Sequence, residues 1–435
     1  MKKSELKKIA YYTIGCRLNQ YETERMAAAL YPFGFRRAAP GEKADLYLIN
    51  TCTVTQRADQ SSRHIIRRAA RENPTAKVVV AGCYVDSDPA LTAAITGVDI
   101  TLHNREKDFI AEILPERLPE LFKGLKPDPE FKADIADFCG HNRTWLKISD
   151  GCDQCCAYCI LPLVRGPLTN RPAGEIIDEI NQLVESGFEE IVITGLNMGM
   201  YKDHEAEKPV KNLAALCRMI ISDTDIRRIR LSSVEPQTIN DDLIKVFADS
   251  AGRICRHWHL SLQSGSSRIL KLMRRPYTRE KFIERALSLK NALPNTVIGA
   301  DIIVGFPGET DDDFNESKTL SELNLLDYLH VFSYSDRPGT EAEKMPDKIN
   351  SEIIKERSGV LTDISKQNRR KAHLRQVGET LGVIAENKKR GGNFYWAVAD
   401  NYLRVKMPES FEGGKQIVEV KITAAFDAYL EGEIV

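Results

Sequence analysis

The sequence predicts an α/β fold in three parts: an N-terminal parallel α/β domain, a central partial (βα)6 barrel and a small C-terminal β-barrel. Three observations predict it. Short β-type runs alternate with amphipathic helical stretches up to about residue 101. The same rhythm repeats six times between Thr144 and Tyr334, two units short of a complete barrel. Residues 376–435 then change to the alternation of β-strands.

The first domain, expected over residues 1–115, has three strand-like runs, which read KIAYYTIG, DLYLINT and KVVVAG. Each run is separated from the next by a helical stretch, as in a parallel sheet with helical crossovers. Prolines then accumulate, and they indicate a linker over residues 116–140.

The central domain, expected over residues 141–375, begins each repeat with a strand and continues with a helix. A charged helical segment from Asn350 to Arg375 leads out of it, and Gly391 and Gly392 mark a turn in the final domain, residues 376–435. The six expected strands read TWLKI, EIVITG, RIRLSS, HWHLSL, VIGADIIVG and YLHVFSY.

Composition narrows the function classes. Of the 435 residues, 28% are charged and 42% hydrophobic, and the net charge is -1, so any site for a polyanion must be local. No apolar stretch approaches the roughly 20 residues of a membrane helix, so no membrane association is expected. Without an export signal, the ten cysteines are expected in the reducing cytoplasm, where metal or redox chemistry explains them better than disulfides.

Three cysteines of the first domain each come just after an expected strand. They are Cys16, Cys52 and Cys83. Because the carboxyl ends of parallel strands meet at one crevice, these thiols are expected to lie together. Three thiolates can hold an iron-sulfur cluster and leave one iron without a protein ligand. The alternative is three small buried residues in tight turns.

A second group of cysteines lies in CDQCCAYC, after the first strand of the expected barrel. Cys152, Cys156 and Cys159 form a CxxxCxxC pattern, whereas Cys155 is next to Cys156 and cannot easily reach the same ion. Three close ligands suit a cubane cluster with one open iron. Zinc is the alternative, although zinc sites favour a second pair of ligands that is missing nearby.

These residues resemble a known family. CxxxCxxC with Tyr158 before its last cysteine, on a partial barrel, resembles the radical S-adenosylmethionine enzymes. With the upstream cysteines and a C-terminal barrel resembling the TRAM RNA-binding module, the chain resembles the methylthiotransferases. TIGCRLNQYETE and NTCTVTQRADQ are most similar to the branch that modifies threonylcarbamoyladenosine in tRNA. Other stretches that fit are RIRLSSVEP, HLSLQSGSSRILKLMRRPYT, ADIIVGFPGETDDDF and HVFSYSDRPGTEA.

The resemblance implies two 4Fe-4S clusters and S-adenosylmethionine as cofactors. One cluster would cleave S-adenosylmethionine to a 5'-deoxyadenosyl radical, and the other would carry the sulfur. The implied product is a methylthio group on C2 of N6-threonylcarbamoyladenosine at position 37, in the tRNA anticodon stem-loop. An electron donor and a sulfur source of unknown identity are implied as further partners.

Cofactor contacts are expected at the mouth of the barrel, where the expected strands end. Glu235 is a candidate for an amine or a ribose hydroxyl, and glycines allow close approach of the backbone. Gly305 is equally explained as a turn before a helix. The candidate residues are Tyr158, Gly195, Asn197, Glu235, Gln263 and Gly305.

RNA contacts are expected first on the arginine-rich segment after Cys52, where Arg63, Arg67 and Arg71 recur every four residues. A solvated helix face is the alternative. Lys388 and Lys389 of the C-terminal domain are also expected to contact RNA, although the seven basic and nine acidic residues of that domain leave it with a net charge of -2. Further expected substrate contacts are Asn19, Arg165 and Arg171.

Three other functions remain open. A sister enzyme acting on isopentenyladenosine in tRNA, or on a ribosomal protein side chain, would share the same clusters. The acidic C-terminal domain favours the protein substrate, and the arginine-rich segment favours tRNA. A non-catalytic RNA-binding protein that carries zinc is the third.

Overall fold

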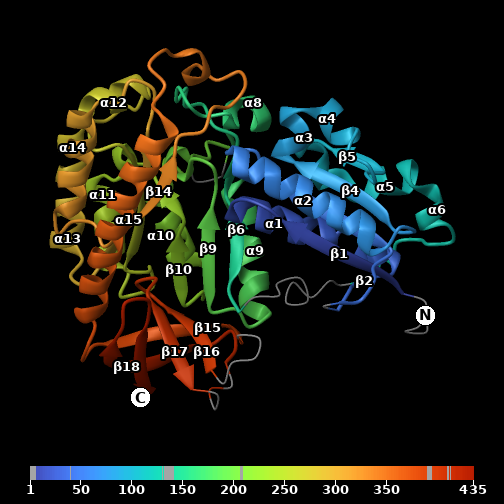
Figure 1. The fold of residues 1–435 in the computed structure, drawn as a ribbon. Helices are drawn as coiled ribbons and strands as arrows, with labels where there is room; N and C mark the ends of the chain where they lie inside the picture. Colours follow the sequence, from blue (N-terminus) through green and yellow to red (C-terminus); the bar gives the residue numbers. More distant parts are fainter. Residues whose placement is uncertain are drawn as a thin grey trace.

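The computed structural model describes residues 6–39, 41–129, 131, 142–205, 209–388, 394–408, 411 and 413–435. Figure 1 shows a domain on each of two sides of a central arc of strands: the N-terminal domain beside the β6 edge, and the C-terminal barrel below. None of the helices in these ranges is long and apolar enough to cross a membrane.

The N-terminal domain is a parallel α/β domain, as predicted, and its sheet has five strands in the order β2-β1-β3-β4-β5. The short strands β2 and β5 were not predicted. β3 and most of β4 are buried because alternate residues of both strands pack into two apolar clusters, one on each face of the sheet. The strands are β1 (Lys7–Thr13), β2 (Phe35–Arg37), β3 (Leu46–Thr51), β4 (Lys77–Gly82) and β5 (Ile100–Leu102). The helices are α1 (Arg17–Ala28), α2 (Gln56–Glu72), α3 (Cys83–Ser87), α4 (Pro89–Ala93), α5 (Ile110–Arg117) and α6 (Pro119–Phe122).

The core of this domain extends beyond the expected boundary at residue 115. Leu118, Leu121 and Phe122 pack with Leu114 into the same apolar cluster as β1 and β3. Pro119 begins α6, where a proline is well tolerated at the first turn. The prolines therefore shape two short helices of the domain, and α6 lies within the segment expected to be a linker.

The central domain is an arc of six principal parallel strands, as predicted, with β11 continuing the line of β10. Helices lie on the outside of the arc, and α15 runs along β14 toward the C-terminal barrel (Figure 1). The strands are β6 (Thr144–Lys147), β7 (Ser149–Asp150), β8 (Thr169–Asn170), β9 (Glu190–Thr194), β10 (Arg228–Leu231), β11 (Ser233–Val234), β12 (His257–Gln263), β13 (Val297–Val304) and β14 (Tyr328–Ser333). The helices are α8 (Leu161–Arg165), α9 (Ala173–Glu185), α10 (Leu213–Asp223), α11 (Asp241–Asp249), α12 (Ser267–Leu272), α13 (Arg279–Ala292), α14 (Asp311–Glu322) and α15 (Ser351–Leu374).

The C-terminal domain is a closed β-barrel, as predicted, and its strands have the order β15-β16-β17-β19-β18. Its apolar core also includes Val297 and Tyr328 of the central domain, so the two domains share a core. The strands are β15 (Thr380–Lys388), β16 (Phe394–Ala399), β17 (Arg404–Pro408), β18 (Ile417–Ala425) and β19 (Leu430–Ile434).

Candidate active site

The three N-terminal cysteines meet at the carboxyl ends of β1, β3 and β4, as their positions predicted. Gly15 has a φ of +110°, and a Cβ added there would lie 2.7 Å from Cys52 Cβ, so only glycine allows the Cys16 loop to approach Cys52. Burial raises the pKa of Cys52 to about 12, and the nearby Cys83 and Cys16 thiols add to that rise. The three thiols are therefore electrostatic neighbours.

The three barrel cysteines lie in the loop between β7 and α8. Burial raises the pKa of Cys159 to about 12, with further contributions from Cys156 and Cys152. Arg275 opposes this rise, and its Nη1 donates to Cys156 Sγ at 3.1 Å. Cys155 is exposed. The loop thus brings together the three cysteines of the CxxxCxxC pattern.

A single zinc ion limits how far apart its sulfur ligands can lie. Two sulfurs bonded to one zinc at about 2.3 Å can lie at most about 4.6 Å apart. Among the described residues, the group of three metal-ligating side chains whose ligand atoms all fall within 4.8 Å is His259, Asp301 and His330, not either cysteine triad. Neither triad is therefore closed around a single-ion site in this structure.

The two cysteine triads lie on either side of one apolar contact. Cys83 packs with Ile160 and Val164, and Ile160 is the residue after Cys159. α3, which begins at Cys83, thereby lies against α8 of the barrel. The fold places the two candidate cluster sites next to each other.

Arg165, expected to contact substrate, is instead buried at this junction, with a side chain only 1% exposed. Its Nε donates to Cys83 Sγ at 3.2 Å, and its Nη2 donates to Glu22 at 3.0 Å and to Asn19 at 2.6 Å. A second acid, Asp150, lies 3.2 Å from Nη1. Arg165 therefore positions the N-terminal triad against the barrel.

Asn19 and Arg171 likewise have roles inside the protein rather than the expected substrate contacts. Asn19 is buried, and its Nδ2 donates to the carbonyl oxygens of Ile14 and Thr51 at 2.8 and 2.9 Å, which fixes the loops before Cys16 and Cys52. Arg171 Nη1 forms an ion pair with Glu179 at 2.8 Å.

Asn197 and Gly195 lie at the end of β9, and their cofactor contacts stay a prediction; close packing on Ser149 already explains the glycine at position 195. Asn197 Nδ2 lies 3.9 Å from Cys152 Sγ, and its Oδ1 is buried with no hydrogen-bond donor among the described residues. A Cβ on Gly195 would lie 2.4 Å from Ser149 Oγ. An orphaned acceptor beside a cluster ligand suits the amino group of S-adenosylmethionine. Tyr158 packs edge-on against Phe306.

Glu235 and Gly305 depart from the expected roles. Arg275 binds Glu235 in a buried ion pair, so the carboxylate is already neutralised. Gly305 has a φ of +79°, and a Cβ there would lie 2.3 Å from Ile354 Cγ1, so this glycine is explained by a turn packed on α15. Gln263 ends β12 with a φ of +62° beside a register shift, and its role stays a prediction.

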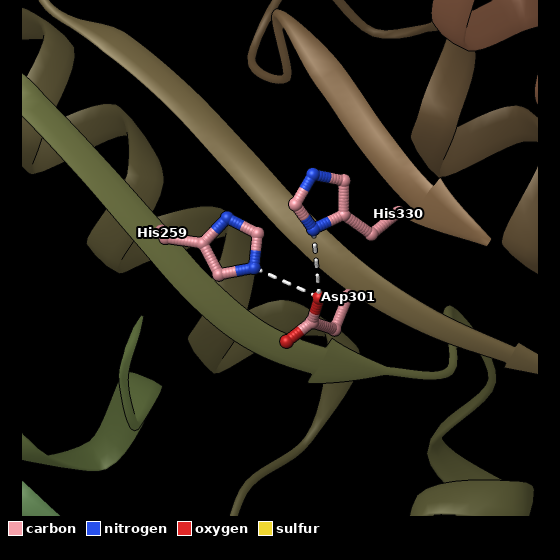
Figure 2. A group of neighbouring side chains, drawn as sticks. All are labelled: His259, Asp301 and His330. Atoms are coloured by element: carbon pink, nitrogen blue, oxygen red, sulfur yellow. Dashed lines mark hydrogen bonds and ion pairs between the residues drawn. The ribbon is translucent and has the colours of Figure 1, made fainter. Parts of the chain in front are cut away.

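A cavity of about 650 Å³ opens beside Cys16 inside the arc of strands. Gly195 and Leu196 line one part of it, and Arg17, Tyr402 and a group of histidines line another. Figure 2 shows His259 and His330 on either side of Asp301, whose Oδ1 lies 2.8 Å from His259 Nε2 and 3.4 Å from His330 Nδ1. Burial raises the pKa of Asp301, but the two imidazoles hold it at about 2. The cavity joins the N-terminal triad to the end of β9.

The arginine-rich segment forms α2, which begins four residues after Cys52. Arg67 and Arg71 are exposed and line a surface hollow with Arg63. None of the ion pairs within the described ranges includes these three residues, although Arg63 Nη1 donates to Tyr84 Oη at 2.9 Å. Their RNA contact stays a prediction. Lys389 and the side chain of Lys388 lie outside the described residues.

Sequence reasoning missed several residues of this site. Arg275 follows another arginine in LKLMRRPYT, and its partners Cys156 and Glu235 are far away in the sequence. Arg17 follows Cys16 directly, and this position next to an expected cluster ligand could have identified it as a site residue. Tyr402 lies in the C-terminal domain, and nothing in the local sequence connects it to Cys16.

Comparison with known proteins agrees with this arrangement. Residues 8–102 match the family described as "Uncharacterized protein family UPF0004", and residues 146–320 match the Radical SAM superfamily. Proteins named "Threonylcarbamoyladenosine tRNA methylthiotransferase MtaB" are similar: the Bacillus subtilis protein is 37% identical, covering 98% of this chain and 96% of its own, and the Aquifex aeolicus protein is 34% identical, covering 94% and 99%. The chain belongs to the radical S-adenosylmethionine tRNA methylthiotransferase family.

Further comparisons include a relative named for a different base and a solved structure with a similar fold. A tRNA-2-methylthio-N(6)-dimethylallyladenosine synthase from Thermodesulfovibrio yellowstonii is 31% identical, covering 97% of both chains. Among solved structures, the radical S-adenosylmethionine methyltransferase TsrM from Kitasatospora setae has a TM-score of 0.56 at 15% identity, covering 78% of this chain and 77% of its own. That likeness shows the shared fold. As a member of the radical SAM superfamily, this methylthiotransferase uses an iron-sulfur cluster and S-adenosylmethionine.

Proposed function

We propose that this enzyme attaches a methylthio group to C2 of N6-threonylcarbamoyladenosine at position 37 of tRNA. The observation that carries the proposal is the pairing of two cysteine triads across the Cys83–Ile160 contact, with a cavity beside one of them. One site for radical generation and one for a sulfur carrier must face the same substrate in such a reaction. The similarity to enzymes named for threonylcarbamoyladenosine, at 37% identity, supports this base over dimethylallyladenosine, at 31%.

Cys152, Cys156 and Cys159 would hold one 4Fe-4S cluster, and Cys16, Cys52 and Cys83 would hold the second. The first cluster, when bound, supplies the reductive cleavage of S-adenosylmethionine that generates a 5'-deoxyadenosyl radical, and the second supplies the sulfur. The chain's own residues orient the reactants and exclude water. Asn197 Oδ1 is positioned to accept a hydrogen bond from the amino group of S-adenosylmethionine near Cys152.

The remaining partners follow from this chemistry. The cleavage step requires an electron donor, and repeated turnover requires a sulfur source. Arg67 and Arg71 on α2 would contact phosphates of the anticodon stem-loop, since they are exposed cations on the helix that follows Cys52. A tRNA substrate and reduced cysteines imply that the enzyme works in the cytoplasm.

Mass spectrometry of tRNA nucleosides tests the function. Deletion of the gene should remove the 2-methylthio form of threonylcarbamoyladenosine and leave its precursor to accumulate, while methylthiolated isopentenyladenosine stays unchanged. Complementation should succeed with wild type and with Cys155→Ala, and fail with Cys83→Ala or Cys156→Ala. Loss of the isopentenyladenosine product instead would assign the enzyme to the sister branch.

A further inference from the structure

The cavity beside Cys16 is cationic where Arg17, Arg143 and Tyr402 line it. Arg17, the first residue of α1, donates from Nη2 to the Tyr402 hydroxyl at 2.6 Å. Tyr402 reaches this point from the C-terminal domain. The guanidinium groups of Arg143 and Arg230 lie 6.0 and 5.4 Å from the centre of its ring. Three arginines therefore surround one tyrosine at the wall of the cavity.

Most charged side chains near Arg17 and Tyr402 are already in ion pairs. Glu190 is bound by Arg228 and Arg230, and Arg143 donates to Glu386 at 2.9 Å. Asp301, the acid that lines the cavity, is held by His259 and His330.

Arg17 differs from the neighbouring arginines because it has no acidic partner among the described residues. The hydrogen bond to Tyr402 goes to a neutral hydroxyl, and none of the ion pairs in the described part of the chain includes Arg17. The cavity wall therefore presents a cation without a counter-ion.

The arginines shift the pKa values of two neighbouring side chains, Tyr402 and His257. Burial raises the pKa of Tyr402, yet Arg17, Arg143 and Arg230 together hold it below its ordinary value. Burial lowers the pKa of His257 far below its ordinary value, and Arg230 and Arg17 contribute to that shift. His257 is thus neutral, and the positive potential comes from the arginines.

We propose that Arg17 binds the carboxylate of the threonylcarbamoyl group and thereby selects the carboxylate-bearing base. This inference rests on the proposed function. C2 and the N6-bearing carbon of adenine flank the same ring nitrogen. A base whose C2 faces the Cys16 site therefore has its N6 substituent within reach of the next residue, Arg17. A guanidinium and a carboxylate can form two parallel charged hydrogen bonds.

The same arrangement rejects the alternative base. A dimethylallyl group is apolar and would enter the cavity against a guanidinium that has no acid partner. Desolvating that charge without pairing it disfavours binding. Tyr402 is a positioning residue in this scheme, because its hydroxyl fixes the guanidinium and touches no reacting atom.

Binding of anticodon stem-loops to anaerobically reconstituted enzyme tests the proposal. Two ligands are compared, one carrying threonylcarbamoyladenosine and one carrying its neutral carboxamide. Wild type should bind the carboxylate about 10- to 100-fold more tightly than the amide. Arg17→Gln should lose this preference while its affinity for the amide changes little, and Arg17→Lys should keep much of it.

Two further variants separate charge recognition from damage to the adjacent Cys16 site. Tyr402→Phe lies in another domain, and it should reduce the carboxylate preference severalfold with the iron content unchanged. Arg218→Gln removes an exposed arginine on α10 and should leave both affinities unchanged. Equal binding of both stem-loops by wild type, or a preference that survives Arg17→Gln, would overturn the inference alone. Failure of wild type to bind either stem-loop would overturn the proposed function as well.

Discussion

Arg165 of the barrel and Glu22 of the N-terminal domain form a buried ion pair, with Arg165 Nη2 donating to Glu22 Oε2 at 3.0 Å. Lys107 donates to the same carboxylate at 2.5 Å. Burial raises the pKa of Glu22, but these two cations hold it far below its ordinary range. The same Arg165 donates to Cys83 Sγ, so an interdomain ion pair also supports a candidate cluster ligand.

Replacement of Arg165 by methionine should therefore destabilise the protein by about 3 kcal/mol or more, because two acids at the junction lose a buried partner. Denaturant unfolding measures this change. The exposed ion pair of Arg370 with Asp427 supplies a matched control, and Arg370→Met should change stability by at most about 1 kcal/mol. If Arg165 were instead a free substrate contact, its loss would weaken tRNA binding and leave the unfolding curve unchanged.

Iron content distinguishes the two cysteine triads. Reconstituted wild type should hold about eight irons per chain, and replacement of Cys152, Cys156 and Cys159 by alanine should leave about four. Replacement of the N-terminal triad should also leave about four. Cys155→Ala should retain the full amount because Cys155 is next to Cys156 and lies outside the CxxxCxxC pattern. Zinc in place of iron in anaerobic preparations would contradict both cluster assignments.

The longer strands of the parallel sheets and the meeting of each cysteine triad were predictable from the sequence. Strands can be recognised from their local periodicity, and the carboxyl ends of parallel strands meet at one edge of the sheet. A cysteine after each strand therefore predicts a shared crevice. Which arginines are buried in ion pairs and which are exposed was not predictable in this way. Arg165 and Arg67 look alike in sequence, yet only Arg165 meets Glu22 and Asp150 from distant segments.

The contact between Arg17 and Tyr402 was even less predictable from the sequence. Arg17 and Tyr402 are 385 residues apart, and no local pattern encodes their contact. For Gly305 the sequence left two explanations open, a cofactor contact and a turn before a helix, and the structure supports the turn. Its positive φ and its packing on Ile354 explain the residue without a ligand. Burial and long-range pairing decide these roles, and both follow only from the folded chain.

The exposed face of α2 should contribute the salt dependence of tRNA binding. Each neutralised phosphate contributes about 0.9 to the slope of log K against log salt, so Arg67→Gln with Arg71→Gln should lower the slope by up to about 2. Arg63→Gln should have a smaller effect because Tyr84 holds this side chain. Stem-loop affinity across a salt series gives the slopes.

Arg68 provides the matched control on the same helix. Its Nε forms an ion pair with Glu72 at 3.1 Å, and its guanidinium carbon lies 5.0 Å from the centre of the Tyr12 ring. Arg68→Gln should therefore leave the salt slope nearly unchanged. An unaltered slope in the Arg67 and Arg71 double variant would show that this face is merely solvated.

Glu190 joins the barrel to the C-terminal domain through two arginines. It is fully buried, accepts from Arg230 Nε at 2.9 Å, and also pairs with Arg228. Those arginines donate onward to the carbonyl oxygens of Gly382, Asp400 and Ala399. Burial raises the pKa of Glu190, but Arg228, Arg230 and Arg143 hold it far below the ordinary value.

This shift predicts how stability depends on pH. Because the folded pKa is depressed, ionised Glu190 contributes stability above its unfolded pKa of about 4.5, and this contribution is lost as the pH falls toward the folded pKa. Glu190→Gln should lower the free energy of unfolding by about 3–5 kcal/mol near neutral pH. The difference from wild type should shrink as the pH is lowered from about 5 to about 3. Denaturant titrations at several pH values measure it, with exposed Glu322→Gln as the control; a pH-independent difference would contradict the assignment.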